Sequence, residues 1–144
     1  MKVVRLVDIQ NTEREVSCPK GGFTSFRFLL ERDLMGFSLH RTEIPVGDTQ
    51  HWHYKNHLEA CYCIEGKGEL RNLATHEPYF IEPDTLYVLD KHDDHKFTAF
   101  EPVVLLSIFN PPVVGTEVHL CDGSYVAPGE VCADCDHRTE NNHE

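Results

Sequence analysis

Short segments in which apolar and polar residues alternate run through most of this 144-residue chain, and Gly, Pro, Asp and Asn separate them. A period of two is typical of β-strands with one buried face, and no stretch carries the apolar stripe of an amphipathic helix. The pattern predicts strands over residues 23–30, 35–44, 58–64, 68–72, 78–81, 86–90 and 103–109. Several short strands at this spacing favour an all-β sandwich or barrel, and Gly66 and Gly68 predict a tight hairpin between the third and fourth strands.

Charge and length restrict what the chain can be. The 13 Lys and Arg residues stand against 24 Asp and Glu residues, and the net charge of -11 argues against a nucleic-acid partner. No apolar run approaches the roughly 20 residues that cross a bilayer, and the first residues become charged before a signal-peptide core forms. We therefore expect a single-domain cytoplasmic protein with reduced cysteines and no membrane contact.

Two of the predicted strands gather polar side chains on one face. Glu59 and Cys61 share a face of the strand over 58–64, and His40 and Thr42 share a face of the strand over 35–44, because successive side chains point to opposite sides. A buried carboxylate such as Glu59 needs a cation or a metal as its partner. Polar groups that converge inside a small barrel indicate a ligand cavity.

The segment HWHYKNHLEACYCIEGKGEL concentrates groups that bind metals, and the later segment LYVLDKHDDH adds more. Imidazole and carboxylate groups near the start of barrel strands are typical metal ligands. A histidine taken alone is more often structural, and we expect that role for His51, His57 and His92. The remaining candidates are His53, Glu59, Tyr87 and His95.

The spacing of some of these residues resembles that of the cupin family. Gly47, His53, Glu59 and Gly66 fall at the positions of its first motif, although Lys55 replaces the second histidine of that motif. His95 falls where the second cupin motif has its histidine. The resemblance implies an all-β cupin fold, a small β-barrel or jelly roll, over residues 1–120.

Three longer segments, HYKNHLEACYCIEGKGEL, LYVLDKHDDH and FNPPVVGTEVHLCDGSY, closely resemble the ectoine synthase family. The resemblance implies that Glu59, Tyr87 and His95 hold a metal ion. Fe²⁺ is the metal expected, with zinc or manganese as alternatives, since two oxygen donors and one nitrogen donor suit these ions. The resemblance also implies that the protein is a homodimer and that it acts as a carbon–oxygen hydro-lyase.

The same resemblance implies the substrate and the residues around it. The substrate is N-γ-acetyl-L-2,4-diaminobutyrate, whose α-amine attacks its own amide carbonyl to form ectoine with loss of water. Phe23, which stands where the family usually has tryptophan, is expected to bind the substrate together with Arg27, Thr42 and Phe109. The candidates for proton transfer are Tyr54, Glu117 and His119, and the sequence does not rank them. Arg27 and Glu117 could instead pair with each other.

The end of the chain and two other functions remain as alternatives. Residues 121–144 form an acidic Cys- and His-containing segment, which we expect to be a poorly ordered tail. Cys132, Cys135 and His137 allow a zinc site there, but little sequence surrounds them to hold it. The rival functions are a non-catalytic cupin module that binds an ectoine-like ligand and another mononuclear-iron cupin enzyme.

Overall fold

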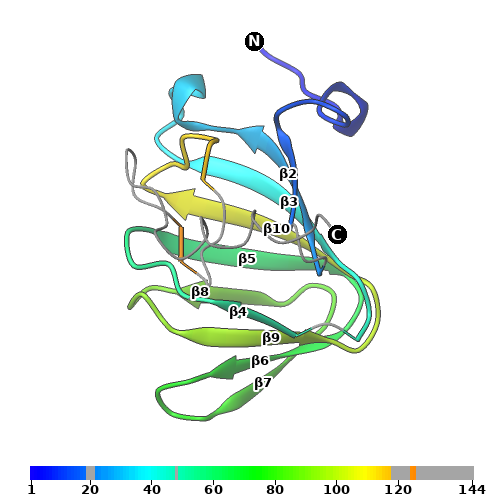
Figure 1. Ribbon diagram of the computed structural model, residues 1–144, viewed down its shortest axis with the longest axis vertical. Coiled ribbons are helices and arrows are strands. Elements are labelled where there is room, and N and C mark those ends of the chain that lie inside the picture. Colours follow the sequence, from blue (N-terminus) through cyan, green and yellow to red (C-terminus); the bar gives the residue numbers. More distant parts are fainter. Residues whose placement is uncertain (19–21, 48, 118–123, 126–144) are drawn as a thin grey trace, which may run out of the picture.

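The computed structural model describes residues 1–18, 22–47, 49–117 and 124–125, and in these residues the chain forms two antiparallel β-sheets (Figure 1). The six-stranded sheet contains, in spatial order, β1 (Glu15–Ser17), β2 (Thr24–Leu29), β3 (Ser38–Ile44), β10 (Val103–Asn110), β5 (Leu58–Glu65) and β8 (Leu86–Leu89). The four-stranded sheet contains β4 (Thr49–Trp52), β9 (His95–Ala99), β6 (Gly68–Asn72) and β7 (Pro78–Ile81). Two 3-10 turns, η1 (Leu6–Asp8) and η2 (Glu31–Asp33), complete the described elements.

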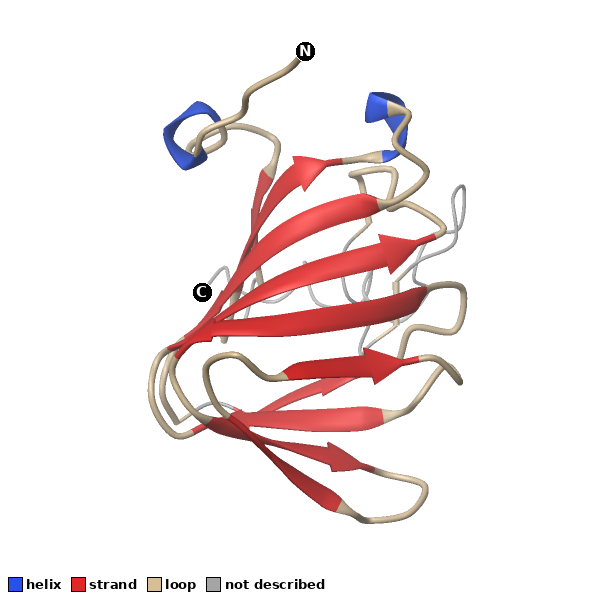
Figure 2. Cartoon of the chain, turned by 180° about the vertical axis from the view of Figure 1, so that it is seen from behind, coloured by secondary structure: helices blue, strands red, loops and turns tan. Residues whose placement is uncertain are grey.

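The all-β prediction is confirmed, and each predicted strand has a counterpart in the sheets. Figure 2 shows the two sheets from behind, the larger above the smaller, with only short helical turns near the top. Side chains of both sheets form one buried core, in which the ring centroids of Tyr87 from β8 and Phe97 from β9 lie 6.4 Å apart. No helix among the described residues has the length and apolar character required to span a bilayer.

Three strands were not predicted, namely β1, β4 and β9. In β9 the buried His95, Phe97 and Ala99 alternate with the more exposed Lys96 and Thr98, so the period of two is present. The charged run that precedes the strand hides this pattern in the sequence. β4 is short, and it pairs with β9 to form one side of the four-stranded sheet.

The predicted hairpin at Gly66 and Gly68 is wrong. β5 pairs with β10 and β8 in one sheet, whereas β6 pairs with β7 and β9 in the other, so the chain crosses between sheets at this turn. Gly66 has a φ of +82°, and a Cβ there would collide with the carbonyl oxygen of Pro102. The glycine signal marked the turn correctly, but a turn signal does not specify which strands pair across it.

β5 carries its polar groups inward and its apolar groups outward. Glu59, Cys61 and Cys63 are buried, while the residues between them point out of the sheet. The outer sides of β8 and β10 continue this surface, since Leu86 of β8 lies opposite Tyr62 of β5. We call the resulting surface the outer apolar face, and its exposed residues are Leu58, Tyr62, Ile64, Leu86, Val88 and Ile108.

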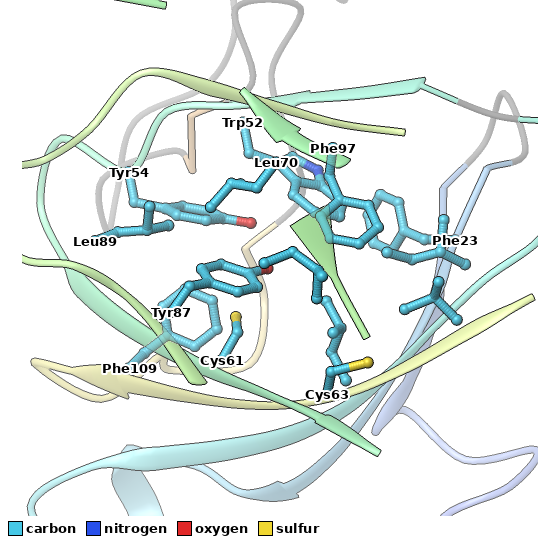
Figure 3. Close-up of a cluster of buried hydrophobic side chains, with 14 of the residues drawn as sticks. Phe23, Trp52, Tyr54, Cys61, Cys63, Leu70, Tyr87, Leu89, Phe97 and Phe109 are labelled. Carbon is cyan, nitrogen blue, oxygen red and sulfur yellow. The ribbon is translucent and has the colours of Figure 1, made fainter. Parts of the chain in front are cut away.

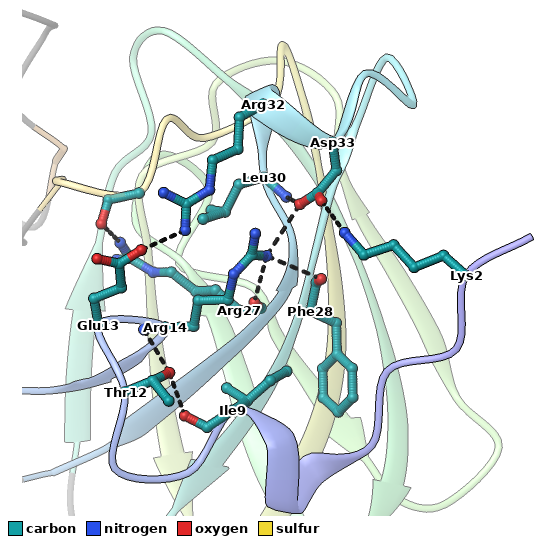
Figure 4. A network of polar contacts seen from close by, with 11 residues as sticks. Lys2, Ile9, Thr12, Glu13, Arg14, Arg27, Phe28, Leu30, Arg32 and Asp33 are labelled. Carbon is teal, nitrogen blue, oxygen red and sulfur yellow. Dashed lines mark hydrogen bonds and ion pairs between the residues drawn. The ribbon is translucent and has the colours of Figure 1, made fainter.

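A polar network around Asp33 connects the N-terminal segment to the six-stranded sheet (Figure 4). The Asp33 carboxylate accepts hydrogen bonds from Lys2, from the Leu30 amide at 2.9 Å and from Arg14 Nη1 at 3.0 Å. Arg14 Nη1 also donates to the carbonyl of Phe28 at 3.1 Å. Burial alone would raise the pKa of Asp33, but the bonds from Lys2, Leu30 and Arg14 outweigh it and lower that pKa below its ordinary value.

Replacement of Asp33 by Asn should destabilise the fold, because Arg14 and Lys2 would lose a charged acceptor. The network lies at the surface, where solvent screens it, so we expect a loss of about 1 kcal/mol near neutral pH, measured by urea unfolding. A depressed pKa stabilises the folded state above the unfolded pKa of about 3.9. The difference between Asp33→Asn and the unmodified protein should therefore shrink as the pH falls below that value.

Glu13→Gln is the matched control. Glu13 forms an exposed ion pair with Arg32 at 2.6 Å, on the same part of the surface. Exposed pairs contribute little to stability, so this variant should unfold at the same urea concentration as the unmodified protein. An equal loss in both variants would show that general surface charge, rather than the Asp33 network, stabilises this region.

Candidate metal centre and cavity

Three polar side chains from three strands point into the core, and each has a terminal atom without a hydrogen-bond partner. Glu59 comes from β5, Tyr87 from the adjacent β8, and His95 from β9 in the opposite sheet. Their exposed fractions are 6%, 8% and 1% respectively. Glu59 Oε2, Tyr87 Oη and His95 Nε2 are all buried and lack a hydrogen-bond partner. Buried polar atoms without partners are costly, and a bound ion is one explanation for several of them in one core.

The hydrogen bond of His95 leaves its other nitrogen free for a metal. Nδ1 lies 2.9 Å from the carbonyl oxygen of Asp93, which can only accept, so Nδ1 carries the hydrogen and Nε2 carries the lone pair. Burial lowers the pKa of His95 and favours the neutral ring. A neutral imidazole whose other N–H is held by a carbonyl is the form that binds metal ions.

The Glu59 carboxylate is held on one side only. Its Oε1 accepts a hydrogen bond from the Cys61 thiol at 3.1 Å. Burial raises the pKa of Glu59 to about 7, although hydrogen bonds with Cys61 and Ser107 act in the opposite direction. A cation beside Oε2 would hold the carboxylate in its ionised form.

The Tyr87 phenol completes the set of donors. Burial, followed by the charges of Cys61 and Glu59, raises the pKa of Tyr87 well above its ordinary value. Only a nearby cation would reverse this effect and favour the phenolate. Among the described His, Cys, Asp and Glu residues, no group of three or more is arranged to hold a metal, so a site here depends on this tyrosine. With it, two oxygen donors and one nitrogen donor fit iron, manganese or zinc.

A small cavity lies beside Glu59. Its empty volume is about 300 Å³, but the centre of a water molecule can occupy only about 10 Å³ of it. That space fits roughly one water molecule, so a larger ligand requires the walls to move apart. The lining residues are Phe23, Ser25, His40, Thr42, Trp52, Tyr54, Glu59, Leu105, Ser107, Phe109 and Tyr125.

Aromatic rings form most of the cavity wall (Figure 3). The Tyr54 ring lies edge-on to Phe109, with centroids 5.0 Å apart, and packs against Tyr125 at 4.9 Å. Tyr54 also lies 6.4 Å from the ring of His95, and its hydroxyl and that of Tyr87 both point into the interior in Figure 3. Burial, followed by the charges of Tyr125 and Glu59, raises the pKa of Tyr54 well above its ordinary value, so its phenol keeps its proton at neutral pH.

Sequence reasoning missed several lining residues. Trp52, the only tryptophan of the chain, lies on the unpredicted strand β4 and packs edge-on against Phe23 at 5.5 Å. Tyr125 falls in the segment that the sequence assigned to the tail, yet it is buried in the cavity wall. His40 was placed on the polar face of its strand but given no role, and it lines the cavity beside Phe109 at 5.0 Å.

Arg27 and Glu117 hold the loop that follows β10. The buried Arg27 donates from Nη1 to the carbonyl of Gly115 and from Nη2 to the carbonyl of Glu117, each at 2.8 Å. The Glu117 carboxylate accepts from the amides of Val114 at 2.7 Å and Gly115 at 2.6 Å. The guanidinium therefore bonds to the backbone of Glu117 rather than to its carboxylate. Both side chains stabilise the loop, and neither lines the cavity.

The remaining histidines and cysteines singled out in the sequence either lie outside the cavity lining or fall outside the described residues. His51 bonds to Asp94 at 2.6 Å on the surface, His57 donates to the carbonyl of Pro111 at 2.8 Å, and His53 Nδ1 lies 4.0 Å from Asp94. The described part of the chain excludes His119, Cys132, Cys135 and His137, so the structure says nothing of a proton-transfer role for the first or of a zinc site at the others.

Comparisons with known proteins agree on one family. Residues 1–129 match the family described as ectoine synthase. The L-ectoine synthase of Teredinibacter turnerae is 47% identical over 125 residues, which cover 87% of this chain and 95% of that protein. The crystal structure of ectoine synthase from P. lautus superposes with a TM-score of 0.75 at 40% identity and covers 80% of this chain and 81% of that chain.

A more distant structure shows the fold alone. The Cnp3 cupin domain of Schizosaccharomyces pombe has a TM-score of 0.53 at 15% identity, covering 61% of this chain and 64% of that one. The range matched to the family includes both sheets and all the described residues of the cavity. The expected cupin fold and the expected family are therefore confirmed, and this chain belongs to the ectoine synthase family of enzymes.

Proposed function

We propose that this enzyme converts N-γ-acetyl-L-2,4-diaminobutyrate into ectoine and water, with a metal ion held by Glu59, Tyr87 and His95. One observation carries the proposal, namely that three buried donor atoms of suitable type lack hydrogen-bond partners in the core, and that the residue of one of them, Glu59, lines a cavity. The relatives named L-ectoine synthase support the substrate and the product. We further propose that the product serves as a compatible solute in osmotic stress.

Fe²⁺ is the metal we propose, with zinc or manganese as substitutes, because two oxygen donors and one nitrogen donor suit these ions. When bound, such an ion would supply Lewis acidity to a carbonyl oxygen in the cavity. Three protein ligands would leave further coordination positions for substrate. The remaining requirements of the reaction fall to the side chains of this chain.

Ring closure needs a curled substrate. One C–N bond forms between the α-amine and the amide carbon, and the carbonyl oxygen leaves as water with two protons from that amine. The close aromatic walls around Tyr54 and Phe109 suit a folded chain, which makes the attack effectively unimolecular. They also keep bulk water from the product amidine. Thr42 and Phe23 line the same cavity and are the proposed substrate contacts, with Phe109.

Tyr54 is the proton-transfer residue that the geometry favours. Of the three candidates it alone is both described and part of the cavity wall, since the Glu117 carboxylate is bonded to two backbone amides. A phenol that keeps its proton can donate to an oxygen that must leave as water. For Arg27 and Glu117 we propose an indirect role, in which they hold the loop beside the cavity.

We also propose that the protein is a cytoplasmic homodimer. The outer apolar face, which includes Tyr62 and Leu86, is a surface that association would cover. β8 is the last strand of its sheet among the described residues, and a second copy could pair with its outer edge. Reduced cysteines are part of this proposal, and the described Cys61 and Cys63 are buried in the core.

Replacement of His95 by Ala should abolish both metal binding and turnover. Loss of a residue that orients a metal ligand lowers metal affinity by up to about 100-fold, and we expect loss of the ligand itself to lower it further. The test is anaerobic reconstitution with Fe²⁺, metal analysis, and NMR detection of ectoine from the acetylated substrate. His51→Ala is the control, because it removes a surface imidazole that is bonded to Asp94 and lies outside the core. Equal metal content and activity in both variants would remove His95 from the proposed site.

Replacement of Tyr54 by Phe should lower kcat by about 100-fold or more, since a general acid contributes that much, and should leave the bound metal unchanged. The exposed Tyr79, whose hydroxyl donates to Glu77 at 2.7 Å, provides Tyr79→Phe as the control. Unchanged kcat in Tyr54→Phe would exclude Tyr54 as the acid.

If the unmodified protein binds ectoine but forms none, the non-catalytic binding module becomes the better explanation. Oxygen uptake with another substrate would favour a different iron enzyme.

A further inference from the structure

Cys61 lies next to two residues of the candidate metal site, Glu59 and Tyr87, without being one of its proposed ligands. It is almost fully buried on the inner face of β5, two residues after Glu59. The strand register places it opposite Ser107 of β10 on one side and opposite Tyr87 of β8 on the other. Cys61 therefore neighbours both ligands of the six-stranded sheet, and Figure 3 shows its sulfur next to the Tyr87 ring.

The thiol connects Ser107 to the Glu59 carboxylate. Cys61 Sγ lies 3.1 Å from Glu59 Oε1 and 3.2 Å from Ser107 Oγ. A thiol has one hydrogen and a carboxylate can only accept, so the S–H donates to Glu59. The Ser107 hydroxyl contacts the sulfur and also acts on the Glu59 carboxylate, whose pKa it lowers. Oε1 is thereby occupied, while Oε2 stays buried and without a partner.

We propose that Cys61, anchored by Ser107, is a positioning residue that holds the Glu59 carboxylate with one oxygen turned toward the metal. The inference rests on the metal centre proposed above. A carboxylate side chain can rotate about its last bonds, and a donor fixed on one oxygen restricts that rotation. Partners behind a metal ligand commonly orient it in this way, and their loss weakens metal binding.

Two observations distinguish this role from that of a ligand. The Cys61 thiol already bonds to Glu59 and Ser107, so coordination of a metal by the sulfur would break these contacts. Cys61, Glu59 and His95, moreover, do not form a metal-holding group among the described residues. Cys63 offers an internal comparison, because it is buried on the same face but bonds to the carbonyls of Glu65 at 3.4 Å and Gly66 at 3.8 Å.

The test measures the dissociation constant for Co²⁺ by competition with a chelator, together with the absorption spectrum of the bound ion. Cys61→Ala should weaken Co²⁺ binding by about 10-fold or more, because the Glu59 carboxylate loses its anchor. Cys61→Ser, which keeps a donor, should restore most of the affinity, and Ser107→Ala should weaken it. Cys63→Ala is the matched control and should bind Co²⁺ as the unmodified protein does.

Melting curves identify any variant that fails to fold. If Cys61→Ala does not fold, the Co²⁺ affinities of Cys61→Ser and Ser107→Ala test the positioning role instead. Unchanged affinity in both Cys61→Ala and Ser107→Ala would overturn the positioning role but leave the metal centre intact. An intense sulfur-to-cobalt charge-transfer band, lost in Cys61→Ser, would instead make Cys61 a ligand and also overturn the proposal. If the unmodified protein binds no Co²⁺ and no Fe²⁺, the metal centre and the positioning role both fail.

Discussion

The Glu59 carboxylate lies in the core between two sheets, and the surrounding architecture has to accommodate it. Its burial favours the protonated form, with a pKa near 7, and Cys61 satisfies only one of its oxygens. Tyr87 and His95 bring two more unsatisfied atoms into the same core. Three such atoms would be a considerable cost if nothing bound them. A metal ion would offset that cost, and it would also join Glu59 and Tyr87 of the larger sheet to His95 of the smaller one.

Local alternation in the sequence predicted the all-β class and the polar inner face of β5, because these depend only on neighbouring residues. Pairing depends on distant segments, so the link between β5 and β6 was misassigned as a hairpin although Gly66 was correctly placed in a turn. Trp52 and Tyr125 were missed for the same reason, since only the folded chain brings them to the cavity. The backbone contacts of Arg27 and the Glu117 carboxylate carry no signal in residue types at all.

Hydrogen bonds join the loop after β10 to β2 and to η2. Arg27 holds the carbonyls of that loop, and the Glu31 amide donates to the carbonyl of Val113 at 2.9 Å, so η2 and the loop are connected. Asp33 of η2 is bonded in turn to Arg14 and Lys2. The space inside the cavity fits about one water molecule, so any larger guest must displace the side chains that line it.

The reversed faces of β5 also bear on how that strand finds its alignment. Because side chains alternate, a slip of one residue would bury Tyr62 and Ile64 and carry Glu59 into water. Apolar burial would favour the slipped arrangement, so hydrophobicity cannot select the observed one. One constraint on the alignment lies at the end of the strand, where Gly66 approaches the Pro102 backbone and no side chain fits. For β5, the absence of a side chain at the turn thus acts together with the ladders to β8 and β10 to fix which residues face inward.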